Sequence, residues 1–98
     1  MIQISGEKDA FKLDVHGAYL RRTDLSNANL EGANLSGANF TDAILRGANL
    51  NNAILNGTIL RGADLTDAKN LTRAQLETAI IDDRTRLPTL AADVPIVE

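Results

Sequence analysis

The fold is decided by residues 18–67, which read AYLRR TDLSN ANLEG ANLSG ANFTD AILRG ANLNN AILNG TILRG ADLTD in consecutive groups of five. Residues 13–17, LDVHG, fit the same pattern as an earlier copy, with Val15 at its centre. A repeat of fixed length indicates an architecture of stacked units. The centres of the ten clear units are Leu20, Leu25, Leu30, Leu35, Phe40, Leu45, Leu50, Leu55, Leu60 and Leu65, and we expect these side chains to form the structural core.

A period of five is incompatible with both regular secondary structures. In an α-helix, a step of five residues turns each successive leucine by about 140°, so the leucines would be scattered around the helix. In a flat strand, side chains alternate with period two, so every second leucine would point to the opposite face. The chain must therefore bend between units if all the leucines are to share one interior.

The residues on either side of each leucine agree with regular bends. Alanine or threonine lies two positions before each centre from Leu20 on, where a small side chain would also face inward. Two positions after the centre lie residue types that tolerate a positive φ, and Arg22 is the exception. These corner positions are Gly17, Asn27, Gly32, Gly37, Asp42, Gly47, Asn52, Gly57, Gly62 and Asp67. The pattern predicts a coil of short sides joined by corners, and the spacing alone leaves three or four sides per coil open.

The motif of alanine, aspartate or asparagine, leucine and two variable residues resembles the pentapeptide repeat protein family. The resemblance covers residues 18–67 and implies an all-β fold, a right-handed quadrilateral β-helix with four sides and 20 residues per coil. Four units depart from the family pattern at the position before the leucine, which we expect to point outward. The side chains there are Tyr19, Ile44, Ile54 and Ile59, and they form our candidate interaction surface.

The two ends of the chain differ from its middle, as expected for a solenoid whose terminal edges need covering. We predict a single domain, residues 1–98, with an N-terminal cap strand at 1–13 and the repeat coil at 14–67. A C-terminal cap follows at 68–87 and a tail at 88–98. Thr72 and Gln75 have the spacing of a capping box, which predicts a short helix near residues 73–80.

Composition gives little support to catalysis or to a cofactor. The chain has no cysteine, and His16, the one histidine, falls at a corner where a solvated surface role is favoured. The acidic residues are scattered, without the spacing of a known metal site. We therefore expect no enzymatic activity, no catalytic or metal-binding residues and no cofactor.

The resemblance also raises a second function, because some pentapeptide repeat proteins mimic B-form DNA and inhibit DNA gyrase. Three coils at about 4.8 Å each would need about 8 negative charges to match a duplex. Residues 14–67 hold six acidic and four basic residues, a net charge of −2. Arg21 and Arg61 would also share one column and interrupt a negative face. DNA mimicry is thus the less favoured alternative.

The sequence then favours a structural or protein-interaction module whose partner protein it does not name. A net charge of −3 over 98 residues does not favour direct binding of nucleic acid. The chain has no 18-residue apolar run and no signal-peptide pattern at its start, so we expect no membrane segment and, by default, the cytoplasm. A monomer and an end-to-end homodimer both remain compatible with the pattern.

Overall fold

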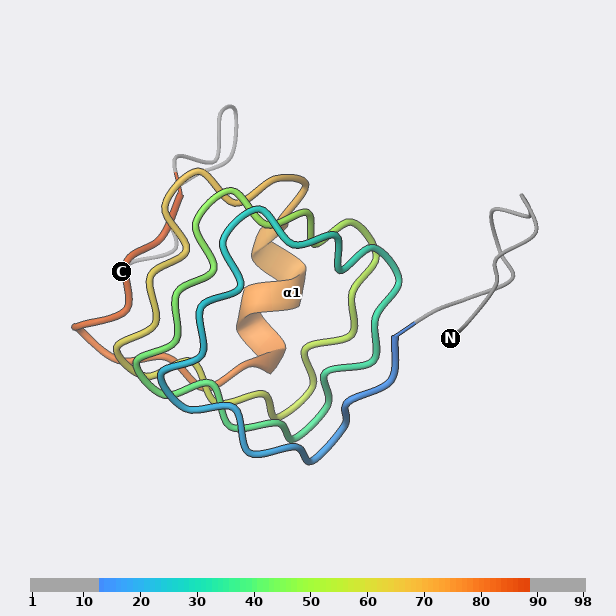
Figure 1. Cartoon of the computed structure of the whole chain (residues 1–98), viewed down its shortest axis with the longest axis horizontal. Coiled ribbons are helices and arrows are strands. Elements are labelled where there is room, and N and C mark those ends of the chain that lie inside the picture. Colours follow the sequence, from blue (N-terminus) through green and yellow to red (C-terminus); the bar gives the residue numbers. More distant parts are fainter. Residues whose placement is uncertain (1–12, 89–98) are drawn as a thin grey trace.

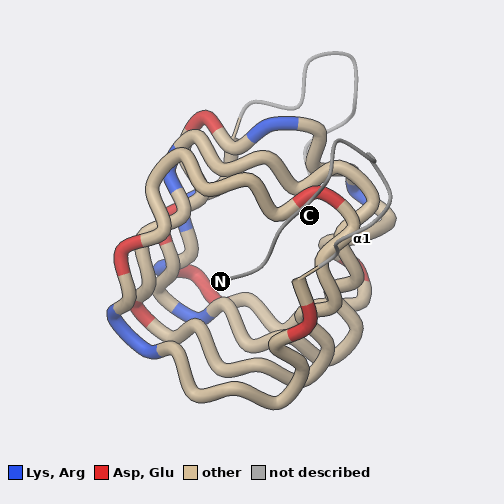
Figure 2. Tube along the Cα trace, turned by 45° about the vertical axis from the view of Figure 1, so that its right-hand side comes forward, with Lys and Arg blue, Asp and Glu red and all other residues tan. Residues whose placement is uncertain are grey.

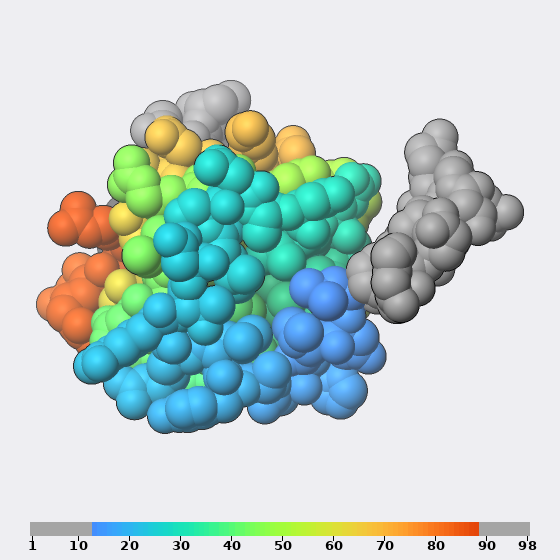
Figure 3. All heavy atoms as spheres, in the orientation of Figure 1, coloured from blue at the N-terminus to red at the C-terminus, as the bar shows by residue number. Residues whose placement is uncertain are grey.

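The computed structural model describes residues 13–88 as a stack of coils that carries one short helix (Figure 1). The N-terminal strand expected at residues 1–13 and the tail expected at 88–98 lie outside the described residues, apart from Leu13 and Pro88. Space-filling representation shows the coils packed directly against one another from residue 13 onward (Figure 3). No helix within residues 13–88 is long enough to cross a membrane.

The register of the coil is 20 residues, and it has four sides. Parallel β-bridges join residues 20 apart along four rows, for example Asp14 to Asn34 and Asn34 to Ile54. Each bridge is isolated, so a side contributes one paired residue rather than a long strand. We call residues 14–33, 34–53, 54–73 and 74–88 the first to fourth coils.

Each corner is closed by the backbone in the same way. The carbonyl of the central residue accepts a hydrogen bond from the amide three residues later, as Leu20 does from Thr23 at 3.3 Å. The residue before that amide has a positive φ near 60–70° at all eleven corners from Gly17 to Asp67. This is the pattern of a type II turn, which requires a positive φ at its third residue. Arg22 obeys it too, with φ of 60°, although its residue type does not favour that conformation.

The interior is filled by the central residues and by the small residues that precede them. Phe40, Leu45 and Leu65 are at most 1% exposed, and alanines such as Ala48 are fully buried between them. Thr58 takes an alanine position, and its buried hydroxyl donates a 2.6 Å hydrogen bond to the carbonyl of Leu35. Burial is nearly complete from Leu30 onward, whereas Leu20 and Leu25 in the first coil are only half-buried.

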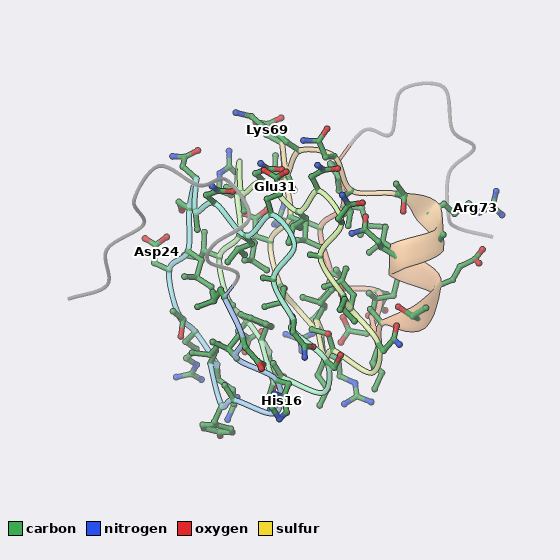
Figure 4. All side chains as sticks on the ribbon, turned by 90° about the vertical axis from the view of Figure 1, so that its right-hand side faces the viewer. His16, Asp24, Glu31, Lys69 and Arg73 are labelled. Atoms are coloured by element: carbon green, nitrogen blue, oxygen red, sulfur yellow. The ribbon has the colours of Figure 1, made fainter. Side chains whose placement is uncertain are left out.

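The chain departs from the repeat at the end of the third coil. Asn70, with φ of 60°, is an additional residue that lets the next leucine, Leu71, turn inward and become buried. Helix α1, Arg73–Thr78, then takes the place of one side, and it lies at the end of the stack in a side view (Figure 4). It begins at a capping box formed by Thr72 and Gln75. The bridges resume at Ile59–Ile80 and Asp64–Arg86, with spacings of 21 and 22 residues.

Gln75 joins the helix to the coil below it. In the regular coils the carbonyl of an alanine accepts from the amide of the next coil, as Ala33 does from Ile54 at 2.9 Å. Helix α1 presents no backbone amide to Ala53, and the side-chain amide of Gln75 donates to its carbonyl instead, at 2.9 Å. The same nitrogen donates to the carbonyl of Leu50 at 2.9 Å. A side chain thus replaces a backbone bond that the helix cannot make.

Candidate functional site

The four sides of the coil present different outward columns. We name them by their content, in chain order. The helix side carries Asp14, Asn34 and Ile54; the tyrosine side carries Tyr19, Asn39, Ile59 and Ile80; the aspartate side carries Asp24, Ile44, Asp64 and Arg86; and the asparagine side carries Asn29, Asn49 and Lys69. The tyrosine side is the one side whose described column contains no charged residue.

Aspartate and asparagine at these outward positions have a structural task at the corner that follows. The side-chain oxygen accepts a hydrogen bond from the amide two residues later, as Asn39 does from Thr41 at 3.0 Å. This local bond stabilises turns. The residues that form it within the repeats are Asp14, Asn29, Asp24, Asn34, Asn39, Asn49 and Asp64.

The four departures from the motif cannot make this bond, and they place apolar groups outward instead. Tyr19 is 71% exposed, Ile54 43% and Ile44 36%, while Ile59 is half-buried. Tyr19 and Ile59 share the tyrosine side, whereas Ile44 and Ile54 lie on the aspartate and helix sides. The structure therefore does not bring all four candidate residues together.

A further apolar residue joins the tyrosine side beyond the repeats. Ile80 is bridged directly to Ile59 and is 38% exposed. The phase of the repeat is lost after Ala68, so counting in fives could not assign Ile80 to this column. Tyr19, Ile59 and Ile80 form what we call the apolar column, with Asn39 between its two ends.

Arginine accompanies three of the four departures, two positions later. The pairs are Tyr19 with Arg21, Ile44 with Arg46 and Ile59 with Arg61. The hydroxyl of Tyr19 accepts a 3.2 Å hydrogen bond from Nη1 of Arg21, and this contact is the main cause that raises the pKa of the guanidinium. This spacing is visible in the sequence but belongs to no conventional motif.

The arginines differ in how they are neutralised. Arg46 pairs with Asp64 at 3.2 Å, Arg73 with Glu77 at 3.5 Å and Arg84 with Asp42 at 3.4 Å. Arg21, Arg22 and Arg61 are exposed, and none of them forms an ion pair with a carboxylate of residues 13–88. Figure 2 shows acidic and basic residues interspersed around the coil, so residues 13–88 present no single-sign face of the kind that duplex DNA presents.

The asparagine side is polar, and its side chains form hydrogen bonds with one another. On the asparagine side, the amide of Asn49 donates to Asn29 at 3.4 Å, and that of Asn70 donates to Asn49 at 3.0 Å. Lys69 continues the column of this side, and Figure 4 labels it with Glu31 at the same edge of the side view. At the corner between the aspartate and asparagine sides, a shallow hollow is lined by Ser26, Asn27, Arg46, Gly47, Asp67 and Lys69.

The titratable groups are arranged as turn and surface groups. His16 Nδ1 lies 2.7 Å from Asp14 Oδ1, both residues are exposed, and the hydrogen bond from His16 lowers the pKa of Asp14. The hydroxyl and then the amide of Ser26 lower the pKa of Asp24. Within residues 13–88, no cluster of three or more acidic or histidine side chains could hold a metal ion. This arrangement offers turn stabilisation rather than acid–base chemistry.

Comparison with known proteins agrees with this geometry. The family model described as pentapeptide repeats matches residues 14–42 and 43–83, with 8 copies of the repeat. The chain belongs to the pentapeptide repeat family. Members of this family adopt a right-handed quadrilateral β-helix, and the 20-residue register agrees with four sides. No curated protein matches the chain.

Solved structures of other pentapeptide repeat proteins are similar to this chain. One from the cyanobacterium Cyanothece 51142 is 33% identical, with a TM-score of 0.66, over 79% of this chain and 52% of that one. One from the thylakoid lumen of Arabidopsis thaliana is 25% identical, with a TM-score of 0.30, over 78% of this chain and 55% of that one. One from Nostoc PCC 7120 is 27% identical, with a TM-score of 0.32, over 81% of this chain and 77% of that one. The chain thus spans about half the length of the first two.

Proposed function

We propose that this pentapeptide repeat chain is a non-enzymatic module that binds another protein through its tyrosine side. The observation that carries the proposal is the apolar column of Tyr19, Ile59 and Ile80, on the side whose described column contains no charged residue. Side chains that break a local rule without a local benefit are expected at functional sites. Tyr19 and Ile59 do so, because each replaces a residue that would bond the corner amide.

The composition of the column agrees with a contact surface. Tyrosine and arginine are the residues most enriched at energetically important positions of protein interfaces, and Tyr19 and Arg21 are hydrogen-bonded neighbours at one end of this side. Ile59 and Ile80 supply adjacent aliphatic surface at the other end. Ile44 and Ile54 lie on the aspartate and helix sides, each without an apolar neighbour in its column. Single exposed apolar residues of this kind are common on protein surfaces.

The coil can hold such a surface in place because its corners and its interior are both fully hydrogen-bonded. Every corner is closed by a backbone hydrogen bond, and no buried side-chain polar atom among residues 13–88 lacks a partner. We propose that α1 and the turn at residues 82–85, closed by the amide of Thr85 and the carbonyl of Asp82, act as the C-terminal cap, because Leu76 of α1 is buried and the hydroxyl of Thr85 donates to the carbonyl of Leu60. A capped, regular coil holds its outward residues at fixed spacing.

Site-specific photo-crosslinking tests the proposal. A benzophenone amino acid would replace Tyr19 or Ile80 on the tyrosine side, and Asn29 or Lys69 on the asparagine side as matched controls. We expect a discrete adduct from positions 19 and 80 in the native host, absent at positions 29 and 69, and abolished by Ile59→Lys. An adduct of twice the chain mass would identify a second copy as the partner. Equal labelling from both sides would contradict the proposal.

A further inference from the structure

We propose that the partner meets this module with carboxylates, recognised by an arginine cluster of Arg21, Arg22 and Arg61 beside the apolar column. The inference rests on the proposed function, since it concerns the same side of the coil. The cluster lies at the corner that follows the tyrosine side, with Arg21 and Arg22 in the first coil and Arg61 in the third. The class of ligand is an acidic segment of a protein that also carries apolar side chains.

The first argument is the absence of neutralising partners. Guanidinium groups donate hydrogen bonds to carboxylates in a planar, bidentate manner, which makes unpaired exposed arginines suitable binding groups for an acidic ligand. No carboxylate of residues 13–88 pairs with Arg21, Arg22 or Arg61. The acidic residue at this corner in the second coil is Asp42, and it pairs with Arg84 from the fourth coil.

The engagement of Asp42 depends on the glycine between those two coils. A Cβ atom at Gly62 would collide with Oδ1 of Asp42 and would lie 3.1 Å from Nη1 of Arg84. Because residue 62 is glycine, Arg84 reaches across the third coil to Asp42. The charge of Asp42 still acts on Arg21, but its ion pair is with Arg84, outside the cluster, so the guanidinium groups of the cluster remain available at the surface.

The second argument is the conformation of Arg22. It has φ of 60°, and it is the one residue among the eleven corners that is neither glycine, asparagine nor aspartate. A long side chain in this region is unfavourable, and backbone strain of this kind concentrates at functional sites. No contact with residues 13–88 accounts for arginine at this position, whereas contact with an external anion does.

The third argument is the orientation of Arg21. The hydroxyl of Tyr19 accepts from Nη1 and fixes one edge of the guanidinium group. The remaining donors of Arg21 are free of partners among the described side chains, and Tyr19 is 71% exposed beside them. An apolar side chain of a ligand could lie on the phenol ring while a neighbouring carboxylate meets the guanidinium.

Nuclear magnetic resonance titration of the full chain tests the inference with defined probes. The probe is a capped ten-residue peptide that alternates glutamate with leucine, and its control alternates glutamine with leucine. We expect the glutamate peptide to shift the Nε–Hε signals of Arg21 and Arg61, with the signal of Arg73 as an internal control. We expect the glutamine peptide to bind at least tenfold more weakly. Added salt should lower the affinity of the glutamate peptide.

Two variants distinguish a loss of binding from a loss of folding. Arg21→Gln combined with Arg22→Gly removes two charges while relieving the strained corner, so the coil is retained, and we expect at least fivefold weaker binding. Arg73→Gln is the matched control and should bind as the unaltered chain does. Equal shifts at Arg73, no binding of the glutamate peptide, or tighter binding of a DNA oligonucleotide would overturn the inference. If both peptides bind the tyrosine side equally, the interaction surface stands and the acidic ligand is ruled out.

Discussion

The first coil and the C-terminal end of the described stack bury their central residues to different extents. The first coil keeps the repeat, and its central residues Leu20 and Leu25 are only half-buried. At the C-terminal end the chain leaves the repeat, and Leu71 of the third coil and Leu76 of the fourth coil are 5% and 2% exposed. Burial within the first coil rises along the chain, and Leu30 at its end is already only 3% exposed. Of the two ends of the described stack, the irregular one therefore buries its leucines more completely.

The backbone shows the same contrast. At the C-terminal end, side chains supply bonds to carbonyls of the regular coils: Gln75 donates to Ala53 of the second coil at 2.9 Å, and Thr85 donates to Leu60 of the third coil at 2.8 Å. In the first coil, the amides of Tyr19 and Asp24 have no partner within residues 13–88. The corresponding amides of the second coil, at Asn39 and Ile44, donate to Ala18 and Thr23.

The largest expected effect is at the centre of the stack. Phe40 is fully buried in the second coil, between Leu20 and Leu60, so Phe40→Ala should lower the free energy of unfolding by about 3–5 kcal/mol. Leu20→Ala in the half-buried first coil should cost about 1–2 kcal/mol. Urea unfolding of both variants measures the difference. Equal losses would show that the first coil is as enclosed as the second, and would remove the contrast.

Replacement of Gln75 addresses the irregular end. The capping box alone tolerates glutamate at this position, but Gln75→Glu would turn a carboxylate toward the carbonyls of Leu50 and Ala53, which now accept from the amide. We expect a loss of about 3 kcal/mol, against about 1–3 kcal/mol for Gln75→Ala. Chemical unfolding followed by circular dichroism measures both losses. A neutral Gln75→Glu would mean that α1 is held by packing of Leu76 rather than by this amide.

The sequence predicted the middle of the molecule better than its ends. The odd period, the corner column and the small residues each follow from local rules, and they agree with the family match over residues 14–83. The register of the fourth coil could not be counted, because Asn70 adds one residue and α1 changes the rise per residue. Ile80 was missed for that reason.

The role of the residue before each leucine also needed coordinates. The sequence shows that aspartate and asparagine recur there. That their side-chain oxygens accept a hydrogen bond from the amide two residues later is seen only in the structure. Without it, Tyr19 and Ile59 are only exceptions to a motif. With it, they are positions that lose a corner bond. The availability of Arg61 likewise depends on Arg84 reaching Asp42 across Gly62, 42 residues apart in sequence.

Gly17 and Gly62 have nearly the same φ but different surroundings. Their alanine variants therefore separate the cost of a left-handed conformation from the cost of steric crowding. Gly17 in the first coil has φ of 70° and no atom within 4 Å of a Cβ, whereas Gly62 has φ of 68° and faces Asp42 and Arg84. Gly17→Ala should cost about 1 kcal/mol from the left-handed conformation. Gly62→Ala should cost about 2 kcal/mol, because it also displaces the Asp42–Arg84 pair. Thermal unfolding of the two variants measures both losses, and equal costs would show that the pair contributes nothing.

The smallest expected effect is on the pH dependence of stability. It compares Asp64, a carboxylate paired with Arg46, with the neutral asparagines that occupy the same position in other repeats. Partial burial raises the pKa of Asp64, but hydrogen bonds from Thr66 and Arg46 outweigh it and hold the pKa below its ordinary value. A lowered folded-state pKa means that this contribution to stability is complete above the unfolded value of about 3.9 and is lost as the pH falls through the folded value. Asp64→Asn keeps the turn bond, as Asn39 does with Thr41, and should cost less than about 1 kcal/mol at pH 7. Urea midpoints measured from pH 7 down to pH 2 should therefore fall less steeply in the variant below pH 4. Parallel curves would show that Asp64 does not contribute to the acid sensitivity of the coil.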